Sequence, residues 1–151
     1  MEERCEMQPI TDSPIVYVVD DHASNRELIS DFLEDLGCEV QLFASGEDAL
    51  NAAAARAPDV VVLDIMMPRL SGYQVCERLR SEPSTAQAGV IMLTALNETA
   101  DVERALEAGA TDFLIKPVQR QELVARVQSL LAHRELSARV DSAVAKLIAT
   151  F

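Results

Sequence analysis

Five polar side chains in this 151-residue sequence could together do metal or phosphate chemistry. Asp20 and Asp21 end one short apolar run, Asp64 ends another, and Thr94 and Lys116 end two more. Two carboxylates about 5 Å apart repel by about 3 kcal/mol at an effective dielectric constant near 20, so three acids in one place need a cation or protonation. Mg²⁺ prefers such oxygen ligands. A carboxylate beside that ion, an ammonium group and a hydroxyl group is equipped to attack a phosphoryl group while the other groups hold its oxygens.

These side chains can meet only if the runs before them are neighbouring strands. Three of the runs are apolar throughout and rich in Val and Ile, which is typical of strands buried on both faces of a parallel sheet. The predicted strands are Ile15–Val19, Val40–Phe43, Val60–Leu63, Val90–Leu93 and Phe113–Ile115. Because ligands bind outside the carboxyl ends of strands in such sheets, the polar groups would share one edge. Only the second run ends without such a group, which an edge strand would explain.

Helical patterns with recognisable ends lie between the runs. Ser45 and Asp48 form a capping-box-like start, and Gly37 and Gly109 stop other helices. The predicted helices cover residues 23–36, residues 45 to just before Pro58, residues 72–81, residues 97–109 starting at Asn97, and a last helix from residue 120. This alternation predicts a right-handed, doubly wound α/β sandwich of five βα units.

The overall composition suits one folded domain and excludes some functions. The 25 acidic against 13 basic residues give a formal net charge of −12, which argues against direct nucleic-acid binding. No run approaches the about 20 apolar residues of a membrane helix, and the first residues show no signal-peptide pattern. Cys5, Cys38 and Cys76 show no metal-ligand spacing and are expected to be free thiols. We therefore expect a cytosolic protein whose residues 1–13 form a loose tail.

Any one of the five polar residues could be an ordinary turn or cap residue, but the joint pattern is far less frequent by chance. The pattern consists of Asp20-Asp21, Asp64 within VVLDIMMPRLSG, Thr94-Ala95, and Lys116-Pro117 within GATDFLIKP. Together these motifs resemble the receiver domain of bacterial response regulators, over about residues 14–132. The resemblance implies a flavodoxin-like parallel sheet with the strand order 2-1-3-4-5.

By this resemblance, the domain is a signalling switch of a two-component system. Asp64 would take a phosphoryl group from a phosphohistidine on a sensor histidine kinase or a histidine phosphotransfer protein. Asp21, Asp64 and the backbone carbonyl of Met66 would bind Mg²⁺, with Asp20 reaching the ion through water. Lys116 would pair with the phosphoryl group.

The same resemblance assigns the response to phosphorylation. Thr94 would turn inward to bond the phosphoryl group, and Phe113 would act as the switch aromatic, with simple core packing as the alternative for Phe113. Their movement would remodel the surface around the fourth and fifth helices. The Lys116–Pro117 peptide bond is expected to be cis.

Three residues near the acids call for a separate interpretation. Met66 and Leu96 stand two residues after Asp64 and Thr94, and their apolar side chains cannot orient an attacking water. We therefore hypothesise that the phosphorylated form is not unusually short-lived. His22 is interpreted as a solvent-facing loop residue, and metal ligation is the less favoured alternative.

The last helical pattern could run to residue 151 and carries two apolar stripes. The first lies between Leu123 and Leu131 and should pack on the sheet, and the second comprises Leu136, Val140, Ala143, Val144, Leu147 and Phe151. At about 100° per residue the stripes are rotated by roughly 130°, so one helix cannot bury both on the same domain. Residues 133–151 are therefore predicted to be a linker or dimerisation helix that supports a homodimer. A tail helix folded back on its own domain is the alternative.

Other functions are weighed on the same residues. The segments MMPRLSGYQVC, VIMLTAL and ARVQSLL also resemble receivers attached to cyclic-dinucleotide enzymes, although we expect no output domain in this chain and no enzyme activity beyond self-dephosphorylation. An aspartyl-phosphate hydrolase would carry a second Asp where Met66 stands. A receiver-like interaction module that is never phosphorylated stays open as the alternative function.

Overall fold

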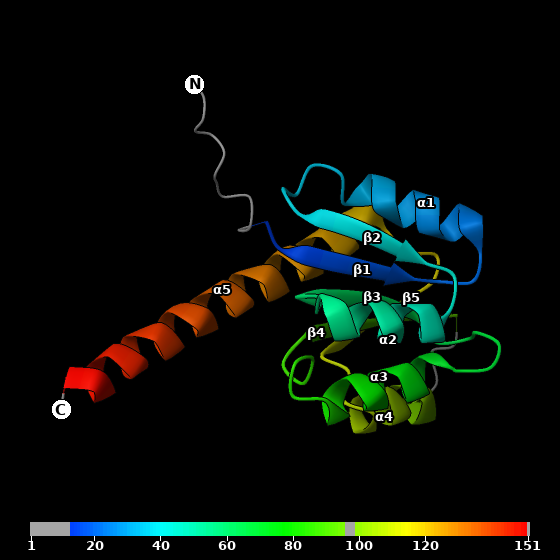
Figure 1. Ribbon diagram of the computed structural model, residues 1–151. Coiled ribbons are helices and arrows are strands. Elements are labelled where there is room, and N and C mark those ends of the chain that lie inside the picture. Colours follow the sequence, from blue (N-terminus) through cyan, green and yellow to red (C-terminus); the bar gives the residue numbers. More distant parts are fainter. Residues whose placement is uncertain (1–12, 96–98, 151) are drawn as a thin grey trace.

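The computed structural model describes residues 13–95 and 99–150. Five parallel strands form one sheet in the order β2-β1-β3-β4-β5, which confirms the predicted doubly wound fold and its strand order (Figure 1). The strands are β1 (Ile15–Val19), β2 (Glu39–Phe43), β3 (Val60–Asp64), β4 (Gly89–Thr94) and β5 (Asp112–Ile115). The run that ends without a polar group is β2, and it lies at an edge of the sheet as predicted.

The helices cover both faces of the sheet. They are α1 (Ala23–Phe32), α2 (Gly46–Ala55), α3 (Gly72–Ser81), α4 (Thr99–Glu107) and α5 (Arg120–Thr150). Helices α2, α3 and α4 pack on one face, and α1 and α5 pack on the other (Figure 1). Two separate apolar clusters therefore fill the space between the layers.

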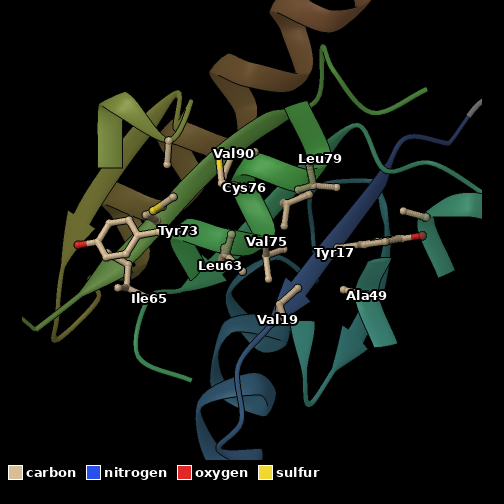
Figure 2. Close-up of a cluster of buried hydrophobic side chains, with 14 of the residues drawn as sticks. Tyr17, Val19, Ala49, Leu63, Ile65, Tyr73, Val75, Cys76, Leu79 and Val90 are labelled. Atoms are coloured by element: carbon tan, nitrogen blue, oxygen red, sulfur yellow. The ribbon is translucent and has the colours of Figure 1, made fainter. Parts of the chain in front are cut away.

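The cluster under α2 and α3 shows why the central strands are apolar up to the polar residues at their carboxyl ends (Figure 2). Val19, Leu63 and Val90 project from three different strands and are at most 1% exposed. Val75 and Leu79 meet them from α3 and are at most 3% exposed. The alternate residues of the same strands face the second cluster, so both faces of each central strand exclude water.

The end of α1 departs from the prediction. The helix ends at Phe32 rather than at residue 36. The backbone N–H of Leu33 donates to both Ile29 O, at 3.2 Å, and Ser30 O, at 3.1 Å, so the hydrogen bonding changes there from a helical pattern to turns. Gly37 has the expected left-handed conformation, with φ 71°, but it ends these turns rather than the helix.

The other element ends agree closely with the sequence patterns. Ser45 caps α2 by accepting a hydrogen bond from Asp48 N at 3.1 Å, as its capping pattern predicted. Several strands extend one residue further than predicted at one or both ends, so Asp64 and Thr94 are the last residues of β3 and β4. The predicted helix start at Asn97 lies outside the described residues.

Helix α5 is continuous, and its two apolar stripes have different surroundings. Leu123 and Val127 are fully buried in the cluster under the sheet. The second half of the helix extends away from the sheet (Figure 1), and its large apolar residues are 46–69% exposed: Leu136, Val140, Val144, Leu147 and Ile148. The alternative of a folded-back tail is therefore wrong for the described length of α5. None of the described helices, α5 included, combines the length and the apolarity that a membrane span requires.

Arg134 marks the point where α5 leaves the domain. Its guanidinium group donates to Gln87 O at 3.2 Å and lies 3.4 Å from Asp59 Oδ1, while Asp59 Oδ2 accepts from Ile15 N at 2.8 Å. These contacts tie the helix to the segments that precede β3 and β4 and, through Asp59, to the start of β1. The division of the chain at residues 13 and 132 stays a prediction, and residues 1–12 and Phe151 lie outside the described residues.

Candidate functional site

The carboxyl ends of four strands bring the predicted site residues to one edge of the sheet. The parallel register sets β3 between β1 and β4, and Asp64 is the last paired residue of β3. Asp20 follows β1 directly, and Thr94 ends β4. The backbone N–H of Lys116 donates to Thr94 O at 2.7 Å, which fixes the start of the β5–α5 loop beside the end of β4.

Lys116 faces two buried carboxylates at this edge. Its Nζ lies 2.9 Å from Asp64 Oδ1 and 4.0 Å from Asp20 Oδ2. Asp20 is 1% exposed, Asp64 2% and Thr94 4%, whereas the Lys116 side chain is 27% exposed. The shorter contact is a charge-assisted hydrogen bond, and the longer one is an electrostatic contact without a hydrogen bond. One ammonium group therefore faces more than one carboxylate.

The metal-free pocket disfavours the ionised form of Asp64. Burial raises the pKa of Asp64, the Lys116 hydrogen bond and charge act against this rise, and the charges of Asp20 and Asp21 add to it. The effects that raise the pKa exceed those that lower it. A cation placed among these groups would favour the ionised, nucleophilic carboxylate.

Two carboxylate oxygens in the pocket are buried without a hydrogen-bond partner among the described residues. They are Asp20 Oδ2 and Asp21 Oδ1. Asp20, Asp21, His22 and Asp64 each offer one ligand atom, and these atoms all lie within 4.8 Å of one another. Buried carboxylate oxygens that lack donors and converge at this spacing are suited to a hard divalent cation, so the residues fit Mg²⁺.

His22, at the start of α1, lies closer to the acids than its sequence context indicated. Its ring is 65% exposed, in keeping with a solvent-facing loop residue, but Nδ1 lies 3.2 Å from Asp21 Oδ1 and 3.5 Å from Asp20 Oδ1. The backbone N–H of His22 also donates to Asp20 Oδ1 at 2.9 Å. Arg26 donates to Asp20 O at 2.7 Å, so the first turn of α1 orients the acidic pair.

The N-terminus of α3 holds the loop that follows Asp64. Ser71 and Gln74 form a capping box, in which Ser71 Oγ accepts from Gln74 N at 3.3 Å and Gln74 Oε1 accepts from Ser71 N at 2.9 Å. A Cβ on Gly72 would lie 2.6 Å from Asp64 O, so only glycine fits beside this strand end. The capping box was not predicted, although Ser-x-x-Gln before a helical pattern is a visible start signal.

The other predicted site residues border the pocket in different ways. Met66 lies in the loop after β3 with its side chain 66% exposed. Phe113 is partly buried on β5 and packs against the cluster under α2 and α3, which fits both its packing role and its switch role. The Lys116–Pro117 peptide bond is cis, as predicted. Leu96 lies outside the described residues.

A cavity of about 400 Å³ lies beside the pocket, and no sequence pattern indicated it. It is lined by Asp20, Asn25, Leu28, Ile29, Leu93, Lys116, Pro117 and Val118. The cavity joins α1 to the segment after β5, and Leu28 on its rim is 49% exposed. Only the fold brings these distant segments together, which is why the sequence alone did not reveal the cavity.

This fold with its acidic pocket defines a class of signalling domain. Residues 16–128 match the family model of the response regulator receiver domain, so the chain belongs to that family. Receiver domains are phosphorylated by histidine kinases, and an acidic cluster of this kind is typical of their Mg²⁺ site.

Individual relatives support the same assignment. The probable transcriptional regulator ycf27 of Cyanophora paradoxa is 45% identical over 120 residues, which cover 80% of this chain and 49% of the relative. Response regulator PleD of Caulobacter vibrioides is 41% identical over 115 residues, which cover 76% of this chain and 25% of PleD. The BeF3-activated receiver domain of DrrB, a Thermotoga maritima protein, has a TM-score of 0.73 and 38% identity, covering 80% of this chain and 98% of that one. The chain spans about half the length of the first curated relatives.

Proposed function

We propose that this chain is a phosphorylation-switched receiver and that Asp64 is its phosphoacceptor. The observation that carries the proposal is the 2.9 Å hydrogen bond between Lys116 Nζ and the buried Asp64, inside a pocket that holds two further carboxylates. A purely structural ion pair would need one acid, whereas here Asp20 Oδ2 is buried without a hydrogen-bond partner among the described residues. The surplus of acid fits a pocket that receives a cation and then a phosphoryl group.

In the proposed reaction, an Asp64 oxygen forms a bond to phosphorus while the bond between phosphorus and a histidine nitrogen of the donor breaks. The histidine nitrogen keeps the electron pair and takes up a proton. Lys116 pairs with the phosphoryl oxygens, and Thr94 donates its hydroxyl hydrogen to one of them. The side chains of Asp64 and Thr94 are both buried at the same edge of the sheet, so a phosphoryl group on Asp64 would form beside the end of β4.

The proposed cofactor is Mg²⁺, held by Asp21, Asp64 and the backbone carbonyl of Met66, with Asp20 reaching it through water. When bound, the ion supplies positive charge that offsets the charges of the carboxylates and the phosphoryl oxygens. The proposed donor is a sensor histidine kinase or a histidine phosphotransfer protein. We place the protein in the cytoplasm, because Cys38 and Cys76 are free thiols.

We assign the response to Thr94 and Phe113. Inward movement of Thr94 would disturb the ends of β4 and β5, which are tied by the 2.7 Å hydrogen bond from Lys116 N to Thr94 O. Rotation of the partly buried Phe113 would accompany that movement. Both changes would alter the surface formed by α4, β5 and α5, where Leu106 and Ile115 are 54% and 42% exposed.

Intact-mass measurement after incubation with acetyl phosphate and Mg²⁺ tests the proposal. The wild type should gain one phosphoryl group, Asp64→Asn should gain none, and Asp141→Asn, which changes an exposed acid on α5, should behave as the wild type. A folded wild type that gains no phosphoryl group from acetyl phosphate or from any phosphohistidine donor would favour an interaction module that is never phosphorylated.

We further propose that the exposed stripe of α5 pairs with the same stripe of a second copy. Leu136, Val140 and Leu147 are 59%, 52% and 60% exposed, at a spacing that suits helix pairing. An apolar stripe on a helix that extends beyond its own domain is typical of an interaction surface.

Sedimentation analysis with and without phosphorylation tests this pairing. Val140→Glu should shift the protein to a monomer, because a charge would be buried between the helices. Ser142→Glu is the matched control, because Ser142 lies on the opposite side of the helix from the stripe and its replacement should leave the dimer intact. A wild type that is a monomer in both states would refute the homodimer.

A further inference from the structure

His22 directs a ring nitrogen at the acidic pocket although the ring itself is largely open to solvent. The side chain is 65% exposed, and Nδ1 lies 3.2 Å from Asp21 Oδ1 and 3.5 Å from Asp20 Oδ1. His22 is the N-cap residue of α1, but its side chain makes no capping hydrogen bond. The His22 side chain is therefore directed at the two acids and does not cap the helix that it precedes.

The same two acids carry the oxygen atoms that lack hydrogen-bond partners. Asp20 is 1% exposed, and its Oδ2 is buried without a hydrogen-bond partner among the described residues. Asp21 Oδ1, which lies nearest to His22 Nδ1, is likewise without one. Asp20 Oδ1 is fixed by the backbone N–H of His22 at 2.9 Å, so the first turn of α1 orients this carboxylate.

The spacing of these ligand atoms suits one six-coordinate ion. Ligands on opposite sides of an ion with bonds of about 2.1 Å lie about 4.2 Å apart, and adjacent ligands lie about 3 Å apart. The ligand atoms of Asp20, Asp21, His22 and Asp64 lie within 4.8 Å of one another, and the nitrogen-to-oxygen distances are 3.2 and 3.5 Å.

A nitrogen donor changes which ions such a pocket prefers. Carboxylate, carbonyl and water oxygens suit Mg²⁺, whereas imidazole suits first-row transition metals such as Co²⁺ and Zn²⁺. We infer that His22 Nδ1 is a ligand in this pocket and that the pocket takes divalent transition-metal ions, through one nitrogen and the neighbouring carboxylates, more tightly than Mg²⁺. This inference rests on the proposed function only in that both need a cation among Asp20, Asp21 and Asp64.

Calorimetric titration of the whole chain with Co²⁺ and, separately, with Mg²⁺ tests the inference. His22→Gln should weaken Co²⁺ binding by about tenfold or more, as expected for the loss of a ligand, and should change Mg²⁺ binding by less than about threefold. His133→Gln is the matched control, because the chain has two histidines and His133 is an exposed residue of α5. All of these variants keep the three cysteines, so any thiol binding is common to them.

A second readout reports on the nitrogen itself. With isotope-labelled histidine, Zn²⁺ should shift the Nδ1 resonance of His22 strongly, and Mg²⁺ should not. The inference would be overturned if the wild type and His22→Gln bound Co²⁺ with equal affinity and both bound Mg²⁺ normally. His22 would then be only an ion-pair partner of the acids, and the proposed function would be unaffected. If the wild type bound neither Co²⁺ nor Mg²⁺, this result would instead refute the cation site on which both proposals rest.

Discussion

Replacing the proposed phosphoacceptor by its neutral isostere should stabilise the metal-free protein. Asp64 lies 2.9 Å from Lys116 Nζ, and its ligand atom lies within 4.8 Å of those of Asp20 and Asp21. At an effective dielectric constant of about 20, two carboxylates 4.8 Å apart repel by about 3.5 kcal/mol. Asp64 and Lys116, 2.9 Å apart, attract by about 6 kcal/mol. The attraction to Lys116 offsets the two repulsions, and burial, the largest cause of the raised pKa of Asp64, leaves a net cost for its charge.

Asp64→Asn should therefore raise the free energy of unfolding in EDTA at neutral pH by about 1–2 kcal/mol, or roughly 3–6 °C in melting temperature. Mg²⁺ should reverse the order of stability. At an ion concentration of about a hundred times the dissociation constant, the wild type should gain about 2.7 kcal/mol. The variant lacks one carboxylate ligand and should gain much less.

The pH dependence of this difference has a defined sign. Because the folded-state pKa of Asp64 is raised, the stabilisation from its proton is complete below the unfolded value of about 3.9 and is lost as the pH rises through the folded-state pKa. In EDTA, the advantage of Asp64→Asn should therefore shrink as the pH falls from neutral. Thermal unfolding followed by circular dichroism checks this, with Asp141→Asn as the control. An Asp64→Asn variant that is less stable than the wild type in EDTA at neutral pH would refute the net cost of the buried Asp64 charge.

Three further predictions concern the lifetime of the phosphorylated form, the contact between α3 and α4, and Gly72. The phosphorylated form should last longer than seconds at neutral pH without a phosphatase. The side chain of Met66 is 66% exposed but is apolar, so it cannot orient a water for attack on the phosphoryl group. Rapid phosphate release from the purified phosphorylated protein would contradict this. Arg104→Met should destabilise the protein by about 0.5–1 kcal/mol, because the guanidinium carbon lies 4.2 Å from the ring centroid of Tyr73 and so joins α4 to α3. Denaturant unfolding in a double-mutant cycle with Tyr73→Leu checks it, and a coupling energy of zero would sink it. Gly72→Ala should cost about 2–3 kcal/mol, because its Cβ would lie 2.6 Å from Asp64 O; a melting temperature equal to that of the wild type would show that the loop relaxes.

Much of the fold was predictable because its local signals and its tertiary structure agree. The central strands are apolar up to their carboxyl ends, and the structure buries both of their faces. The end of α1 was not predictable, because the apolar residues Leu33 and Leu36 continue the helical pattern while the hydrogen bonds have already changed to turns. Periodicity records which side a residue faces and does not distinguish a helix from successive turns on the same side.

The candidate site was predictable where it depends on strand ends and unpredictable where it depends on contacts between distant segments. Asp20 and Asp64 were identified because parallel strands share a carboxyl edge. By contrast, the direction of the His22 ring depends on how the β1–α1 turn folds. Arg80 is similar: it donates to Gly109 O at 2.8 Å and to Ala88 O at 2.5 Å, and no sequence spacing indicates that these carbonyls converge on one side chain.

The change of stripe along α5 reflects a change in what the helix packs against. The helix begins a few residues after Lys116, at the edge of the sheet that holds the acidic pocket, and it buries Leu123 and Val127 under the sheet. It leaves the domain where Arg134 is bonded to the opposite edge. A tail that folded back would keep its apolar residues on the first stripe, whereas here they change side at Leu136, just after the Arg134 contact. One continuous helix therefore joins the edge of the sheet that holds the pocket to an exposed apolar stripe outside the domain. Under the proposed function, this helix would connect phosphorylation at Asp64 with a partner outside the domain.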